Sequence, residues 1–127
     1  MKSREDIESY LMKTGLPYEP LQPELWNVKP EGNENLIISI AGPVVVFRIK
    51  VMDLPPSGRE KLYETMLRLN ATEMIHGAFG VEGNAVVITD ALQLENLDFS
   101  EFQGVIDDVG MAISKHYPAL SKFRVAA

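Results

Sequence analysis

The two histidines are the side chains of this sequence that titrate nearest neutral pH, so they are the first candidates for catalysis or metal binding. His76 and His116 lie in separate predicted elements. Neither has an aspartate, glutamate or second histidine at metal-ligand spacing within its own element. His116 comes near the end of a predicted helix, where an imidazolium is favoured in any case. The pattern favours structural roles for both.

Acidic residues are the next candidates, because paired carboxylates can transfer protons or hold cations. Asp107 and Asp108 are adjacent, so on a helix they diverge, and with Glu101 they indicate a solvated acidic face. Residues 31–35 carry acids and amides, but their spacing matches no calcium-binding loop. We therefore predict no catalytic and no metal-binding residues.

Glycines and cations were considered for anion binding. The glycines of residues 77–80 do not open a helix, so they do not form a phosphate cradle. Arg48 and Lys50 share one face of a predicted strand and are available to an anion, although ordinary solvation of that face is favoured. The chain lacks a nucleophile-elbow serine motif, a Walker loop and a dinucleotide fingerprint. We expect no cofactor and no enzymatic activity.

Composition narrows the class of protein further. The chain has 127 residues, no cysteine and a formal net charge of -6. The acidic balance argues against nucleic acid and against anionic membranes as partners. The first residues are too charged for a signal peptide, and the apolar runs are far below the roughly 20 residues that span a bilayer. We expect a soluble, cytoplasmic protein with one domain over residues 1–127.

The elements that position these side chains can be read from capping and periodicity. Ser3 with Asp6 resembles a capping box, and this predicts a first helix that ends at Gly15. Prolines over residues 16–23 predict an extended loop. Three strands are predicted next, at residues 25–29, 36–41 and 44–52, with a turn over residues 30–35 between the first two. In the third strand, Val45, Phe47, Ile49 and Val51 share the core face, and Val44, Val46, Arg48, Lys50 and Met52 share the outer face.

Capping and periodicity also predict the elements of the second half of the chain. Ser57 with Glu60 predicts a capping box that opens a helix to about Asn70. A hairpin follows, over residues 74–81 and 85–92, and Asp98 opens a last helix that Pro118 ends. Apolar residues in the tail over 119–127 suggest that it packs. The predicted class is α+β, with the order helix, three strands, helix, two strands, helix, an antiparallel sheet, and helices mainly on one face.

The second helix carries a wider apolar stripe than one core contact requires. Leu62, Met66 and Leu69 form one line along it, and Tyr63, Leu67 and Asn70 form another. One line can dock on the sheet while the other remains for a partner. The alternative is that a well-covered helix buries both lines.

The second half also resembles known proteins. The stretch 62–70, then Gly77-Ala78-Phe79-Gly80-Val81, then 86–89, then Leu97-Asp98 opening a long helix, is similar to class I type III secretion chaperones and equally to YbjN-type domains. By element order the resemblance covers most of the chain, and by residues it extends from about Leu62 to Val109.

This resemblance implies a curved sheet and a non-enzymatic homodimer that binds an extended segment of a client protein. Client binding in these chaperones uses apolar patches and sheet edges. The second helix is implied as the dimer or partner interface, through Leu62, Tyr63, Met66, Leu67, Leu69 and Asn70. The alternative implied by the YbjN branch is a signalling or regulatory domain with a regulatory partner and no chaperone activity.

Overall fold

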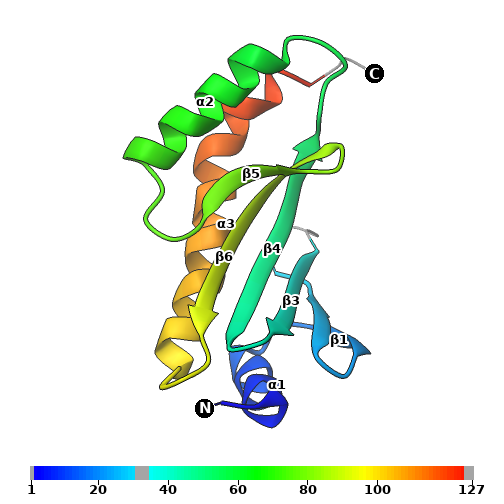
Figure 1. The fold of residues 1–127 in the computed structure, drawn as a ribbon, viewed down its shortest axis with the longest axis vertical. Coiled ribbons are helices and arrows are strands. Elements are labelled where there is room, and N and C mark those ends of the chain that lie inside the picture. The colour runs from blue at the N-terminus through cyan, green and yellow to red at the C-terminus, as the bar shows by residue number, and fades with distance from the viewer. Residues whose placement is uncertain (1, 31–34, 125–127) are drawn as a thin grey trace.

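The computed structural model describes residues 2–30 and 35–124. Within them the chain forms three helices and one antiparallel sheet of six strands in the order β1-β2-β3-β4-β6-β5 (Figure 1). The elements are α1 (Arg4–Thr14), β1 (Tyr18–Gln22), β2 (Leu25–Val28), β3 (Leu36–Ala41), β4 (Val44–Asp53), α2 (Arg59–Thr72), β5 (Ala78–Glu82), β6 (Ala85–Gln93) and α3 (Phe99–Ser121). The α+β class is confirmed, but four strands precede α2 rather than three.

The additional strand, β1, lies in the segment that the prolines predicted to be a loop. Pro20 sits within it, opposite Trp26 of β2, and the register shifts between Pro20 and Gln22. β1 pairs only with β2, so it forms an edge of the sheet. A proline without an N–H is tolerated at an edge, because that position needs no hydrogen bond to a further strand.

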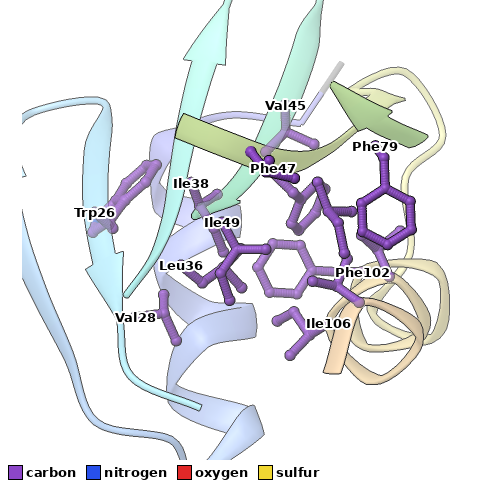
Figure 2. Packing of buried hydrophobic residues seen from close by; sticks show 14 of the residues in the cluster. Trp26, Val28, Leu36, Ile38, Val45, Phe47, Ile49, Phe79, Phe102 and Ile106 are labelled. Atoms are coloured by element: carbon purple, nitrogen blue, oxygen red, sulfur yellow. The ribbon is translucent and has the colours of Figure 1, made fainter. Parts of the chain in front are cut away.

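The core lies between one face of the sheet and the helices α1 and α3. The Phe102 ring of α3 is 5.4 Å from the Phe47 ring of β4, and the Tyr10 ring of α1 is 5.6 Å from the Phe102 ring. Figure 2 shows Phe47 and Phe102 packed among the aliphatic side chains of β2, β3 and β4. Both helices therefore cover the same face of the sheet.

Burial along β4 follows the predicted alternation only as far as Lys50. Phe47 and Ile49 are buried and Arg48 and Lys50 are exposed, as predicted. Beyond Lys50 the prediction was wrong, because Met52 is buried. The register with β6 shifts between Lys50 and Met52, and such an irregularity inserts one residue and reverses the faces that follow.

Helix starts are set by local hydrogen bonds in two cases out of three. In α1 the Ser3 N–H donates to the Asp6 carboxylate at 2.9 Å, and this bond lowers the pKa of that carboxyl. In α3 the Glu101 N–H donates to the Asp98 carboxylate at 2.8 Å. The predicted capping box of α1 is therefore present, and a second box, Asp98 with Glu101, opens α3 at the predicted residue.

The box predicted at Ser57 and Glu60 does not form. The N-cap of α2 is Gly58 in the left-handed conformation, with φ 73°, and no side chain caps it. The guanidinium of Arg59 instead donates to the Pro55 carbonyl and, at 3.2 Å, to the Asn84 side chain. The helix start is therefore held by contacts with the strand β4 exit and the β5–β6 turn.

Pro118 does not end α3, which continues to Ser121. A proline near the end of a helix removes a hydrogen bond and crowds the preceding turn, at a cost of about 3 kcal/mol or more in a helix interior. Leu120 is fully buried, and such burial contributes roughly 1.5–3 kcal/mol. Phe123 also packs against the core, whereas the end of the predicted packed tail, residues 125–127, lies outside the described residues, as do 31–34 of the predicted turn.

Candidate protein interface

At the start of β5 the structure brings together two pairs of titratable groups that the sequence analysis did not connect. The His76 Nε2 lies 3.2 Å from the Asp108 Oδ2, and the Lys115 Nζ lies 3.5 Å from the Glu73 Oε1. Both pairs join the α2–β5 connection to α3. Residues 2–30 and 35–124 contain no group of three or more side chains that could hold a metal ion. The two pairs therefore hold the α2–β5 connection against α3.

His116 is the one buried polar residue of the core within the described ranges, with 6% of its surface exposed. Its ring meets the Phe79 ring edge-on, with centroids 6.2 Å apart. This aromatic contact joins β5 to α3.

The two lines of α2 are treated differently by the fold. Leu62 and Met66 are buried in the core, and Tyr63 and Leu69 are partly buried against it. Leu67 points outward, with 68% of its surface exposed. One line thus docks on the domain, while Leu67 of the second line remains on the surface. Whether this surface binds a partner stays a prediction.

Asn70 has an intramolecular role that the sequence analysis missed. Its Nδ2 donates to the Phe79 carbonyl at 3.0 Å, and its Oδ1 accepts from the Phe79 N–H at 2.7 Å. A side-chain amide carries one donor group and one acceptor group, so it can replace the backbone of a neighbouring strand. The available signal was the asparagine in the last turns of a helix that leads directly into a strand.

The bonds from Asn70 cover an edge of the sheet. Among residues 2–30 and 35–124, β5 ends the sheet on this side and pairs only with β6. Unpaired edges attract other chains, and proteins protect them with prolines, bulges or covering elements. β5 is covered at Phe79 by α2, and β1 at the other edge is interrupted by Pro20 and its register shift.

The outer face of the sheet presents its cations in ion pairs. The Arg48 Nε lies 3.0 Å from the Glu82 carboxylate, and the Lys50 Nζ lies 2.6 Å from the Asp53 carboxylate. All four side chains are largely exposed, so each pair contributes less than about 1 kcal/mol. Arg48 and Lys50, the two candidates for anion binding, are therefore already paired with carboxylates of the chain.

Exposed apolar side chains mark the surface around β5. Met111 of α3 and Ile75 of the α2–β5 connection line the same hollow, beside His76. The exposed large apolar residues on α2, this connection, β5 and α3 are Leu67, Ile75, Val81 and Met111. Contiguous exposed apolar side chains are typical of protein-binding surfaces, and Ile75 and Met111 share one hollow.

The comparisons with known proteins agree with this fold. The family model CesT_Tir_1 matches residues 1–126. The chain belongs to this CesT/Tir-like family of type III secretion chaperones. Comparison with curated protein sequences gives no match. The resemblance stated from the sequence is confirmed.

Solved structures share the fold at low sequence identity. A chain of the ExoU–SpcU complex from the type III secretion system of Pseudomonas aeruginosa has 13% identity and a TM-score of 0.71, with 88% of this chain and 95% of that chain covered. YbjN from E. coli, described as a candidate transcription regulator, has 12% identity and a TM-score of 0.72, with 93% of each chain covered. A chain of the ExsC–ExsE complex has 12% identity and a TM-score of 0.71, with both chains fully covered at 100%. At such identities the likeness establishes the fold alone.

The helices offer no membrane span. Among residues 2–30 and 35–124, no helix is both long enough and apolar enough to cross a bilayer.

Proposed function

We propose that residues 1–127 form one chaperone-like domain that acts in the cytoplasm as a non-enzymatic homodimer and holds an extended segment of a client protein. The observation that carries the proposal is the exposed apolar surface on α2 and around β5, on a chain that belongs to a chaperone family. Similar chains occur in two-protein complexes, ExoU–SpcU and ExsC–ExsE.

The proposed dimer contact is the outward line of α2, with Leu67 at its centre and Tyr63 beside it. Leu62 and Met66 support this line from the core side and do not themselves reach the surface. Asn70 belongs to the line by position, but its amide is engaged with Phe79. Burying an exposed leucine in a contact contributes roughly 1.5–3 kcal/mol per copy, which makes Leu67 the sensitive position.

The test is light scattering coupled to size-exclusion chromatography at micromolar concentration. Leu67→Glu should give a folded monomer, because it places a charge in the proposed contact. The matched control is Arg68→Gln, which alters an adjacent exposed residue and changes the net charge by the same amount, and it should stay dimeric. Met66→Glu should instead lower stability, because it places a charge in the core. A monomeric wild type overturns the dimer, and a dimeric Leu67→Glu variant overturns its location.

A second candidate function is a regulatory domain without chaperone activity, and the similarity to YbjN favours it. The two functions differ in the partner. Purification from the source organism with mass spectrometry should yield a secreted protein for a chaperone and a signalling or regulatory protein for a regulator. A secreted partner whose bound segment becomes resistant to protease supports the leading proposal.

A further inference from the structure

The strand β6 extends beyond its outer neighbour. It pairs with β4 along its whole length, from Ala85 to Gln93, but β5 pairs with it only between Ala85 and Thr89. Residues 90–93 therefore have β4 on one side and, within the described residues, no strand on the other, as the lower half of β6 in Figure 1 shows. We call residues 90–93 the open edge of β6.

Gly77 determines where this open edge begins. Its φ of +75° turns the chain away from β6 just before β5 starts. A Cβ at this position would lie 2.7 Å from the Thr89 carbonyl oxygen and 3.3 Å from the Asp90 Cβ. The close approach to β6 and the turn away from it both require glycine. From Asp90 onward, β5 no longer pairs with the outer side of β6.

Backbone groups of the open edge point outward. The Ala91 N–H donates to the Asp90 Oδ1 at 2.8 Å, and the Thr89 carbonyl oxygen, two residues earlier, faces Gly77 on the side away from β4. In an antiparallel strand, alternate residues direct their N–H and C=O groups to the same side. The backbone N–H and C=O groups of Gln93 therefore point to the same open side as those of Ala91. At this edge the Asp90 carboxylate accepts the one exposed N–H described above, whereas Asn70 and Pro20 protect the edges of β5 and β1.

The Asp90 carboxylate is itself incompletely satisfied. Asp90 lies opposite Phe47, which places its side chain on the helix-facing side of the sheet. Its Oδ2 is buried and has no hydrogen-bond partner among the described residues. A buried carboxylate oxygen without a donor is costly, so a donor arriving from outside would be favoured there.

The segment of the chain that carries the open edge is acidic. Residues 69–114 contain eight aspartates and glutamates and no lysine or arginine. Glu82 and Glu73 pair with Arg48 and Lys115, and Asp108 contacts His76. The other five have no such partner within the described residues: Asp90, Glu95, Asp98, Glu101 and Asp107. These five lie on the second half of β6, the turn after it and the first half of α3. Two lysines of the N-terminal segment come near this region. The Lys2 N–H donates to the Leu94 carbonyl at 3.1 Å, directly after the open edge, and the Lys13 Nζ lies over the Phe99 ring of α3, 4.7 Å from its centroid.

We propose that the open edge of β6 binds an extended segment of a partner protein with lysine or arginine at alternate positions, added to the sheet in line with β5. This proposal rests on the proposed function, because it treats the segment as part of the client. A backbone carbonyl of the segment accepts the hydrogen bond from the Ala91 N–H, and the Asp90 carboxylate no longer accepts it. That carboxylate then pairs with a cation on the helix-facing side of the new strand.

Charge distinguishes this occupant from a second copy of the chain. Pairing two open edges with each other brings two copies of Asp90 and of the same acidic segment together, and like charges at a contact disfavour it. A basic segment instead neutralises them, and the acidic field also steers it to the site.

The test is an NMR titration of the isotope-labelled protein with a short peptide of alternating lysine and valine. The amides of Ala91 and Gln93 should shift, and salt should weaken binding. A matched peptide with glutamate in place of lysine should leave these amides unchanged. Asp90→Asn should weaken the lysine peptide about tenfold, or ~1.4 kcal/mol. Glu60→Gln on α2 removes an equal charge elsewhere and should not weaken it.

Ala91→Pro provides a second variant, because it deletes the edge N–H without touching the pairing with β4. It should abolish the peptide shifts while the remaining spectrum stays native. Shifts confined to β1 or α2, or equal affinity for Asp90→Asn, overturn the proposal. If Ala91→Pro converts a dimer to a monomer, the edge is a contact between copies and the proposal is also overturned. If the peptide does not bind but the dimer and the client complex are intact, only this binding site is refuted. If the peptide binds but no client complex forms, the proposed function is refuted.

Discussion

Replacing Asn70 by alanine tests whether a side-chain amide completes the edge of the sheet. The variant removes both hydrogen bonds to Phe79, at 2.7 and 3.0 Å, which are partly buried beneath α2. Each contributes about 1 kcal/mol net, and a buried N–H left without an acceptor adds about 1 kcal/mol or more. Alanine recovers up to about 0.7 kcal/mol in helix propensity. The expected loss in the free energy of unfolding is therefore about 2 kcal/mol.

Urea denaturation measures this loss, and amide hydrogen exchange locates it. The Phe79 N–H should exchange much faster in Asn70→Ala, while amides at the β4–β6 pairing keep their protection. Arg68→Ala is the control on the same helix, since its exposed pair with Glu64 contributes only about 0.3–0.5 kcal/mol. A loss below about 0.5 kcal/mol, with unchanged exchange at Phe79, refutes the assignment of the amide as an edge cover.

Three further variants or conditions probe the fold. Gly77→Ala should destabilise by about 1–3 kcal/mol in urea, because alanine must adopt a positive φ against the Thr89 carbonyl; a neutral result contradicts the close approach. Leu120→Ala should cost about 2–5 kcal/mol, which calorimetry can measure, and a smaller loss shows that the turn after Pro118 is not held by burial. Acid should weaken the first helix: because the pKa of Asp6 is lowered in the fold, its stabilisation is present above the unfolded pKa and is lost as pH falls through the folded pKa. The unfolding free energy of Asp6→Asn should consequently fall less steeply than that of wild type below about pH 4, and parallel curves contradict the capping role.

The features that the sequence determined by itself are the local ones. The capping boxes of α1 and α3 join residues three positions apart, so the residue types alone reveal them. Alternation placed Phe47 inside and Arg48 outside for the same reason, since neighbouring side chains of a strand must point to opposite faces. The expected site also began as a local pattern, the double apolar line of α2.

Tertiary structure decided the features that depend on residues distant in the chain. Pro20 belongs to a strand because β2 lies beside it and, within the described part of the chain, no strand lies on its other side. Pro118 stays helical because Leu120 reaches the core. Asn70 covers β5 only because α2 crosses the Phe79 backbone, and the open edge of β6 exists only because Gly77 turns the chain away. A pattern along the chain records which face of an element is apolar, but which edge remains unpaired is determined by the strands and helices that the fold brings beside it.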